Sequence, residues 1–353
     1  MTLAAVGALL SIAHFIGAQR GDIGLTTEIA ALLTILIGLL CYHNQLVQAA
    51  AIGVALTWLL ALKPQTRLLA ERISREDVFA TLKFGLITAV LLPLLPDRSY
   101  GPPPLDVLVP REIWLMVVFV SALSFLGYVL DKLLGAPRSL GVTGFVGGLA
   151  SSTALTLSLS RKSREEAAPP TGIAAALLLG WAALLVRLVL IVAVLSPALL
   201  GHLALPLGAA LGIGGLYSLW LYRQSTTQAA EAPTALQNPF ALKPALLFGL
   251  LYALVLLLTH AARLHLGASG LYLSALLGSL AGLNAIAVSL AQLSHNPALP
   301  ISVVAQALSI ALVTNLIVQT ALIWILGAHA LRRPLMAGLF AYALPALLFA
   351  WLL

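Results

Sequence analysis

Apolar segments of about 20 residues follow one another along almost the whole chain, the length of a helix that spans a bilayer. Hydrophobic residues make up 61% of the chain and charged residues 9%. A soluble domain would contain roughly 25% charged residues. The strands of an outer-membrane barrel would alternate in polarity, and these segments do not. The sequence therefore predicts an all-α fold, a polytopic transmembrane helical bundle.

We expect about 12 spans, within a range of about 10–13, because span counts from sequence carry an error of about two. They lie near residues 2–18, 27–43, 46–62, 78–96, 112–130, 140–159, 171–195, 203–222, 244–262, 269–293, 300–326 and 334–352. Residues 1–134 should form an N-terminal helical part and residues 135–353 a C-terminal transmembrane domain. The connection 63–77 alternates apolar and charged residues at helical spacing, which predicts an amphipathic helix at the membrane surface.

Residues 144–163 set hydroxyl side chains into an otherwise apolar run. These residues are Ser151, Ser152, Thr153, Thr156 and Ser158. An unpaired hydroxyl is costly in hydrocarbon, so each must face a neighbouring helix, bond to a carbonyl of its own helix or line a hydrated cavity. Gly147 and Gly148 precede them and permit a close helix contact or a helix break. A packed seam between helices and a polar pathway both explain this segment.

A second copy of the pattern lies further along the chain. Residues 278–290 align without a gap on residues 147–159. The alignment pairs Gly278 with Gly147, Asn284 with Thr153, and Ser289 with Ser158. Transporters are often built from internal repeats, with the substrate site between the repeats and glycine-interrupted helices in corresponding positions. We therefore expect repeat segments over residues 144–163 and 275–294.

The basic connections conflict with a simple topology. Residues 63–77 and 160–170 are the richest in Lys and Arg, and the positive-inside rule places both in the cytoplasm. Three predicted spans separate them, an odd number, so one of these spans must be re-entrant, broken or wrongly divided. The span at 140–159, which contains several glycines, is the first candidate. The repeat is parallel if all spans cross, and inverted if this span turns back.

Two ionisable residues within predicted spans are candidates for function, because charges inside a bilayer are costly. Arg187 lies near the middle of an apolar segment, and Glu28 follows Thr26 and Thr27 at the start of another. A threonine can cap that helix, with Glu28 well placed at its positive end, or Glu28 can face a polar cavity. A salt bridge between Glu28 and Arg187 would be the cheapest way to hold both charges.

The segment 300–326 carries a polar ladder that includes Asn315 and Gln319, four residues apart on one helix face. Hydrogen bonds between helices and a lined pathway are both consistent with it.

The motifs of common enzymes are absent from the sequence: it contains no P-loop, no nucleophile elbow, no zinc-protease motif and no dinucleotide fingerprint. The seven histidines are scattered, and the single cysteine, Cys41, rules out a disulfide framework. We expect no enzyme activity, no metal site and no cofactor. The net charge of +7 agrees with the positive-inside rule and requires no nucleic-acid partner.

Several motifs in one order resemble those of a known family. They are Gly24–Thr34, Ala61–Pro64, Leu91–Pro102, Arg111–Trp114, Leu123–Tyr128, Gly147–Ala154 and Asn238–Pro244. Together they resemble the bacterial MgtC/SapB-related membrane proteins that carry a large C-terminal domain of unknown function, DUF4010. The resemblance implies a protein of the bacterial cytoplasmic (inner) membrane with a transport role that has been linked to magnesium.

The chain departs from that family in two places. Relatives usually begin with an additional helix pair that bears the MgtC-like signature, and this chain starts after it. Their second repeat tends to carry two acids, and their equivalent of the segment 300–326 tends to carry a lysine. The positions here are Gly282, Asn284 and Gln319. Joint loss of two acids and a base indicates that these positions face one another across a shared cavity.

The sequence thus predicts a membrane transporter or channel-like permease for a small ion or polar solute, with the site between the two repeat helices. The alternative is a membrane scaffold or regulator that binds a partner protein or a lipid. The predicted pathway residues are Ser151, Ser152, Thr153, Thr156, Asn284, Ser289, Asn315 and Gln319. Magnesium fits poorly, because a hard divalent cation prefers carboxylate or carbonyl oxygens. The expected partners are the lipid bilayer and the solute, and both a monomer and a homodimer agree with the sequence.

Overall fold

The structure is a computed structural model of residues 1–353, and it describes residues 25–61, 75–134, 139–164, 170–225, 242–297 and 299–352. All regular elements in these ranges are helices. The chain divides into two compact units, Met1–Arg72 and Ile73–Leu353. The predicted span at 2–18 and most of the predicted interfacial helix at 63–77 lie outside the described residues.

The described part of the first unit is a helix pair. α2 (Leu25–Tyr42) and α3 (Leu46–Ala61) contact each other, and a short turn joins them. Asn44 in this turn has a φ of 59°, a left-handed conformation that asparagine tolerates better than most residues. Most residues of both helices are apolar, which is typical of a membrane hairpin.

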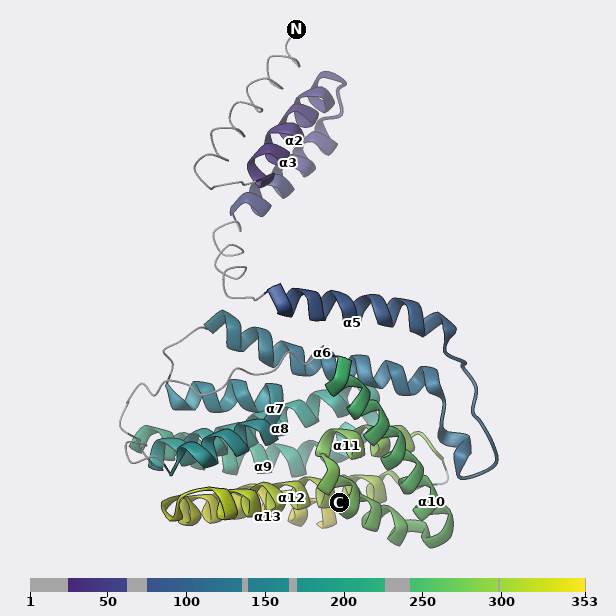
Figure 1. Cartoon of the computed structure of the whole chain (residues 1–353), viewed down its shortest axis with the longest axis vertical. Coiled ribbons are helices and arrows are strands. Elements are labelled where there is room, and N and C mark those ends of the chain that lie inside the picture. Colours follow the sequence, from purple (N-terminus) through teal and green to yellow (C-terminus); the bar gives the residue numbers. More distant parts are fainter. Residues whose placement is uncertain are drawn as a thin grey trace. The chain divides into compact units, whose positions relative to one another are not determined.

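The second unit is a bundle of long helices (Figure 1). They are α5 (Arg75–Leu94), α6 (Pro110–Leu134), α7 (Leu140–Lys162), α8 (Pro170–Leu195), α9 (Pro197–Gln224), α10 (Leu242–Ala281), α11 (Leu283–Leu293), α12 (Ile301–Leu326) and α13 (Arg332–Leu352), with short 3-10 helices η1 (Leu105–Val107) and η2 (His329–Leu331). α8 forms the centre of the core, since most of its residues are buried, and it packs against α7, α9 and α11.

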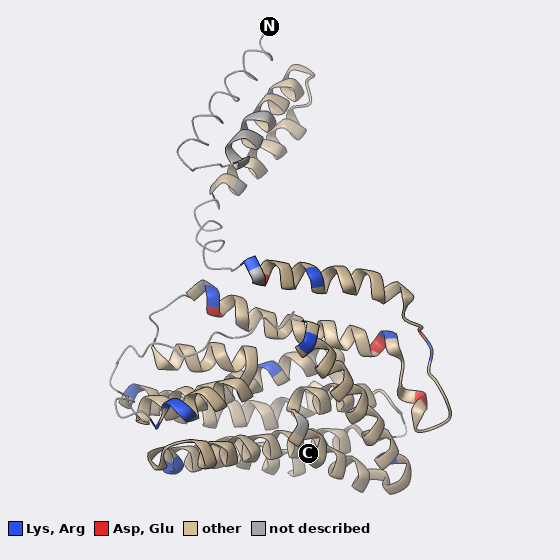
Figure 2. Ribbon diagram, viewed as in Figure 1, with Lys and Arg blue, Asp and Glu red and all other residues tan. Residues whose placement is uncertain are grey.

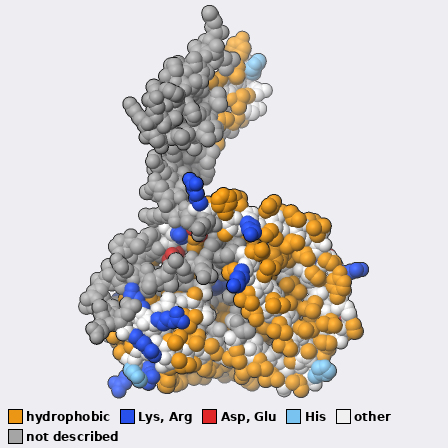
Figure 3. All heavy atoms as spheres, in the orientation of Figure 1, with side chains coloured by type: hydrophobic (Ala, Val, Ile, Leu, Met, Phe, Trp, Pro, Cys, Tyr) orange, Lys and Arg blue, Asp and Glu red, His pale blue; other side chains and the backbone are white. Residues whose placement is uncertain are grey.

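Eight helices in the described part of the chain are long and apolar enough to cross a membrane. Hydrophobic side chains cover most of the face of the second unit that Figure 3 shows, as a surface in contact with lipid requires. The predicted count of about 12 spans is not confirmed. α11 and the apolar parts of α2 and α3 within the described ranges are shorter, and α10 joins two of the predicted spans.

α7 folds back on itself at Ser151, whose φ of −162° and ψ of 102° are not helical. Eight residues of straight helix would separate Gly147 from Leu155 by about 12 Å. Instead, a Cβ atom built on Gly147 would lie 2.9 Å from the Leu155 Cδ1 atom. α7 is therefore a helical hairpin, here called hairpin 1, with arms at residues 140–150 and 152–162.

The second part of α10 and α11 form a similar structure. α10 is interrupted at Gly267, and Gly282, with a φ of 146° and a ψ of 138°, separates α10 from α11. A Cβ atom built on Gly278 would lie 3.1 Å from the Ile286 Cδ1 atom, although these residues are also eight positions apart. Residues 268–281 and α11 are thus the two arms of hairpin 2. The sequence predicted a single span here, at 269–293.

The two hairpins correspond position by position. Their tips, at residues 151 and 282, are 131 residues apart, and so are their contacting pairs, Gly147 with Leu155 and Gly278 with Ile286. The helices that follow keep this offset. α8 and α12 each contain 26 residues and begin at residues 170 and 301, again 131 residues apart.

The hydrogen bonds at the ends of these helices show that α8 and α12 run in opposite directions. Hairpin 1 ends beside the C-terminus of α12, where Arg164 Nη2 donates to the Ile325 carbonyl at 2.6 Å. Hairpin 2 ends beside the C-terminus of α8, where His295 Nε2 donates to the Leu195 carbonyl at 2.8 Å. Because α8 follows hairpin 1 and α12 follows hairpin 2 after short connections, each helix begins where the other ends.

A substitution at Gly282 tests the backbone conformation at the tip of hairpin 2. A Cβ atom at this position would meet open space, but a φ of 146° disfavours every other residue. Gly282→Ala is expected to lower the unfolding free energy by about 1–3 kcal/mol through backbone strain alone. Ser151→Ala, at the corresponding tip with extended φ and ψ, should cost only about 1 kcal/mol, the value of its capping bond. Unfolding in detergent measures both, and equal losses would contradict the assigned backbone conformations.

Candidate functional site

The tip of hairpin 1 begins a new helix inside the bundle. The Ser151 Oγ atom accepts a hydrogen bond from the Ala154 amide at 3.3 Å, so Ser151 caps the second arm as an N-cap serine does. Ser151 and Ser152 are half-buried, whereas Thr153 is exposed. The first turn of the second arm therefore offers backbone N–H groups and two hydroxyl side chains at the middle of the bundle.

Gln319 on α12 is the centre of a buried polar network. Its Oε1 atom accepts hydrogen bonds from Thr156 Oγ1 at 3.0 Å and from Trp181 Nε1 at 2.9 Å. Its Nε2 group donates to Ser152 Oγ at 3.3 Å and to Asn315 Oδ1 at 2.9 Å. All four hydrogen-bonding positions of the amide are thus occupied, and the side chain is 1% exposed. We call these five residues the amide network.

Asn315 extends this network to hairpin 2. Its Nδ2 group donates to the Ser279 carbonyl at 3.3 Å, within the last turn of the first arm. The helix breaks at Gly282, so the Ser279 carbonyl has no helical partner four residues further on, whereas the Gly278 carbonyl still accepts from the Gly282 amide. One turn of α12 therefore contacts both hairpins: Gln319 binds hairpin 1, and Asn315 binds hairpin 2.

Thr153 and Asn284 are corresponding residues, each on the first turn of a second arm. Thr153 is exposed and Asn284 is half-buried. Neither side chain forms a hydrogen bond with any residue that the structure describes. Ser289, by contrast, is fully buried, and its hydroxyl has no partner within the same ranges. Of the predicted pathway residues, Thr153 and Asn284 are thus the ones whose polar groups are accessible and unused.

Arg187 on α8 supports the tip of hairpin 1 from the other side. Its Nη1 group donates to the Leu149 and Ala150 carbonyls, both at 3.3 Å, at the end of the first arm. Its Nη2 group donates to Ser124 Oγ at 2.7 Å and to the Val120 carbonyl at 3.4 Å on α6. A cation suits the C-terminal end of a helix, where the dipole is negative. Arg187 is only 6% exposed, and the charged residues of the second unit are sparse (Figure 2).

The predicted salt bridge between Glu28 and Arg187 stays a prediction. Glu28 belongs to α2, but its side chain lies outside the described residues. Arg187 has no carboxylate partner among the residues that the structure describes. Its four acceptors are three carbonyls and one hydroxyl on hairpin 1 and α6, and none of them is an acidic residue that the sequence would single out.

Sequence reasoning missed Trp181 and Ser124. The Trp181 side chain is 1% exposed, and its indole N–H donates to Gln319. A tryptophan in the middle of an apolar span requires an acceptor for this group, so the pairing of Trp181 with a polar residue could have been expected. Ser124 gave no comparable signal, because a serine in a membrane helix can bond to its own helix, and Ser124 also donates to the Val120 carbonyl.

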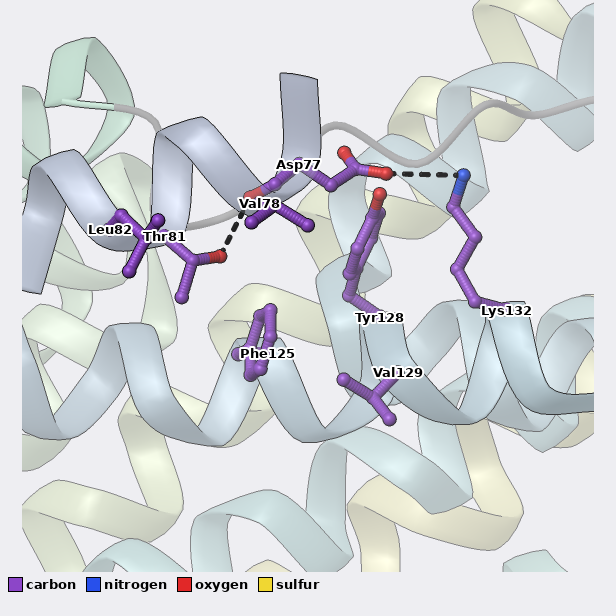
Figure 4. A pocket seen from close by; sticks show the side chains of 8 residues that line it. All are labelled: Asp77, Val78, Thr81, Leu82, Phe125, Tyr128, Val129 and Lys132. Atoms are coloured by element: carbon purple, nitrogen blue, oxygen red, sulfur yellow. Dashed lines mark hydrogen bonds and ion pairs between the residues drawn. The ribbon is translucent and has the colours of Figure 1, made fainter. Parts of the chain in front are cut away.

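A separate pocket of about 220 Å³ lies between α5 and α6 (Figure 4). An ion pair between Asp77 and Lys132, 3.4 Å long, lies at one end beside Tyr128. The rest of the lining includes Val78, Leu82, Phe125 and Val129 and is apolar except for Thr81, whose hydroxyl donates to the Asp77 carbonyl. Such a lining suits a hydrocarbon chain better than a polar solute, so this pocket differs in chemistry from the hairpin tips.

The described residues include no group of three or more His, Cys, Asp or Glu side chains that could hold a metal ion. The polar groups at the hairpin tips are hydroxyls, amides, backbone groups and one guanidinium. These groups can bind a polar solute or an anion through hydrogen bonds, but they provide neither an activated nucleophile nor a general base.

Comparisons with known proteins match the part of the chain that holds both hairpins. The family model described as "Domain of unknown function (DUF4010)" matches residues 118–327, which include hairpin 1, hairpin 2, α8 and α12. An uncharacterised protein of Aquifex aeolicus (strain VF5) is 26% identical over 195 residues, which cover 55% of this chain and 85% of that protein. No solved structure matches.

Proposed function

Because the chain belongs to the family defined by the domain of unknown function DUF4010, and because both hairpins lie inside that domain, we propose that the hairpins are the functional centre of the family domain. We further propose that the protein is a membrane transporter or channel-like permease for a small ion or polar solute. A relationship to MgtC/SapB proteins stays a prediction from the sequence.

The observation that carries this proposal is the pair of broken helices joined by α12. Irregular backbone at membrane depth is tolerated only where protein buries it or where it lines a hydrated cavity. Here two breaks, at Ser151 and Gly282, contact the same turn of α12 through Gln319 and Asn315. Transporters commonly place substrate at such paired breaks near the middle of the bilayer. A membrane scaffold would not require two helix breaks that contact the same turn.

The constant offset of 131 residues supports an internal repeat, and the opposite directions of α8 and α12 support an inverted one. In this interpretation, hairpin 1, α8 and α9 form one repeat, and hairpin 2, α12 and α13 form the other. The contacts agree, because α7 packs on α12 as α11 packs on α8, and α9 packs on α13. Inverted repeats let a transporter open to either side of a membrane by exchanging the conformations of its halves.

A re-entrant hairpin 1 would also reconcile the topology with the positive-inside rule. If α5 and α6 cross the membrane and hairpin 1 returns to the side it enters from, then Arg161, Lys162 and Arg164 lie on the same side as the start of α5. Further cations belong to this side of the bundle: Arg75, Lys132, Arg223, Arg332 and Arg333. The positive-inside rule then places this side in the cytoplasm of a bacterial inner membrane.

The residues at the hairpin tips favour an anion or a neutral polar solute. Beyond residue 170 the only acidic residue of the chain is Glu231, which lies outside the described residues. Divalent cations prefer carboxylate oxygens, and the hairpins carry none. The N-terminal turns of the second arms offer N–H groups, and Thr153 and Asn284 add a hydroxyl and an amide.

Uptake into proteoliposomes tests the proposal. We expect one solute among a panel of inorganic anions, carboxylates and neutral polar molecules to accumulate in vesicles that contain the protein. Thr153→Val and Asn284→Leu should each reduce this uptake by about tenfold, the effect of about 1.4 kcal/mol from one lost hydrogen bond. Thr57→Val, on α3 in the first unit, is the matched control. Correctly folded protein that moves no member of the panel under any imposed ion gradient would count against transport.

A membrane scaffold is the second candidate, and one observation favours it. The amide network is saturated, since Gln319 uses all its hydrogen-bonding positions within the protein, so this interface is closed in the observed conformation. The two functions differ in access of water to the tips. A cysteine placed at Asn284 in a Cys41→Ser background should react with a membrane-impermeant maleimide if the protein is a transporter, and should stay unreactive if the tips form a dry seam.

A further inference from the structure

The two hairpins correspond in sequence and shape but differ in how the rest of the protein holds them. Hairpin 1 is anchored by a charged side chain, since Arg187 links its Leu149 and Ala150 carbonyls to Ser124 on α6. Hydrogen bonds that involve a charged donor are stronger than neutral ones. This anchor joins three elements, α6, α8 and the tip of hairpin 1.

Hairpin 2 has no such anchor in the described structure. The residue that corresponds to Arg187, 131 positions further on, is Val318 on α12. The first arm of hairpin 2 is held to α12 by two neutral hydrogen bonds, from Asn315 to the Ser279 carbonyl at 3.3 Å and from the Tyr272 hydroxyl to Gln306 Oε1 at 2.6 Å. The space beside Gly282 is open, because no atom lies within 4 Å of a Cβ built there.

The glycines show the same asymmetry. Gly144 and Gly148 of hairpin 1 contact the α8 backbone directly, at Ala176 and Gly180. A Cβ atom on Gly148 would lie only 2.6 Å from the Gly180 Cα atom, so the two backbones touch. The corresponding residues of hairpin 2 and α12 all carry side chains. They are Ala275, Ser279, Ala307 and Ala311.

We propose that hairpin 2 is the moving gate of the protein and hairpin 1 its fixed counterpart, and that Arg187 is the positioning residue that makes the difference. This inference rests on the proposed transport function. Opening of hairpin 2 breaks neutral hydrogen bonds to α12, those of Asn315 with Ser279 and of Tyr272 with Gln306, whereas opening of hairpin 1 would strip a buried guanidinium of its carbonyl partners at membrane depth. An unpaired charge there is far more costly than an unpaired amide, so the opening of hairpin 1 is suppressed. Asn284 would then enter and leave the site while Thr153 stays in place.

Hydrogen–deuterium exchange of the full-length protein in lipid nanodiscs tests the inference, because local opening exposes amides to exchange. Peptides across the tip of hairpin 2 should exchange at least about tenfold faster than the corresponding peptides of hairpin 1. Arg187→Val should accelerate exchange in hairpin 1 to the rate of hairpin 2, and Arg187→Lys should restore part of the protection, since lysine keeps the charge but not the forked geometry.

The reciprocal change tests whether a guanidinium at the corresponding position of α12 would anchor hairpin 2. Val318→Arg places a guanidinium on α12 at the corresponding position and is expected to slow exchange in hairpin 2 about tenfold, whereas Val318→Leu should leave it unchanged. Equal exchange of the two tips in the unaltered protein, or faster exchange in hairpin 1, would overturn the inference. If Val318→Arg does not fold, the unaltered protein and the Arg187 variants decide. The measurement requires no substrate, so a mobile hairpin 2 in a protein without uptake would reject transport but not the difference in mobility between the two hairpins.

Discussion

Gln319→Leu is expected to destabilise the bundle and abolish uptake together. Leucine has nearly the same size, so the loss is one of hydrogen bonds rather than of volume. Thr156 can turn its hydroxyl to a carbonyl of its own helix, but the Trp181 indole N–H bonds to no other acceptor among the residues that the structure describes. One stranded donor and the lost links to Ser152 and Asn315 should lower the unfolding free energy by about 2–3 kcal/mol.

The same substitution elsewhere on α12 provides the control. Gln306 is half-buried and accepts one hydrogen bond, from the Tyr272 hydroxyl at 2.6 Å. Gln306→Leu should cost about 1 kcal/mol, the value of a single bond, and should reduce uptake less than Gln319→Leu, because it breaks one bond to hairpin 2 and none to hairpin 1. Thermal unfolding in detergent and uptake in proteoliposomes give both quantities. If Gln319→Leu is no worse than Gln306→Leu, the amide network does not hold the hairpins together.

The positions of most helices could be predicted from the sequence, because apolar runs mark the residues that lipid and core require. The segment 171–195 corresponds to α8 and the segment 300–326 to α12, each within one residue at its ends. The small-residue composition of 144–163 likewise indicated a close helix contact, which the structure shows between Gly148 and Gly180. Helices that face lipid and helices that face protein are both rich in apolar residues. The helix positions therefore follow from composition alone.

The direction of the chain could not be predicted in the same way. A hydrophobic segment that crosses the bilayer and one that returns from its middle have the same composition, and only one residue, Ser151, changes conformation between them. The odd number of spans between basic connections indicated that something turns back, but the tip of hairpin 2 at Gly282 gave no such signal, because a single glycine within an apolar run is common in membrane helices.

The hydrogen-bond partners of Arg187 could not be predicted from the sequence either. A cation inside an apolar span predicts an acidic partner, and the predicted partner was Glu28. The acceptors in the structure are carbonyls that the break at Ser151 releases from helical hydrogen bonding. Any residue type can supply a carbonyl, so this kind of partner becomes visible only after the break has been located. The same reasoning applies to Asn315 and the Ser279 carbonyl.

Gly148→Ser should prevent hairpin 1 from packing, although serine is the natural residue at the corresponding position, Ser279. A Cβ atom at Gly148 would lie 2.6 Å from both the Cα and the carbonyl oxygen of Gly180, and backbone atoms cannot rotate away as a side chain can. Hairpin 1 would have to separate from α8, which also pulls the Leu149 and Ala150 carbonyls away from Arg187. We expect a loss of at least about 3 kcal/mol of unfolding free energy, at the upper end of overpacking costs.

The reciprocal variant separates this steric cause from a general intolerance of the hairpins. Ser279→Gly removes a side chain where hairpin 2 already accommodates one, and its cost should stay near 1 kcal/mol, the helix penalty of glycine. The Asn315 bond should survive, because it is made to the Ser279 carbonyl and not to its hydroxyl. Steric-trapping measurements in bicelles give both unfolding free energies. A Gly148→Ser protein as stable as Ser279→Gly would show that the backbones of hairpin 1 and α8 do not touch, and would remove the structural basis for a fixed hairpin 1.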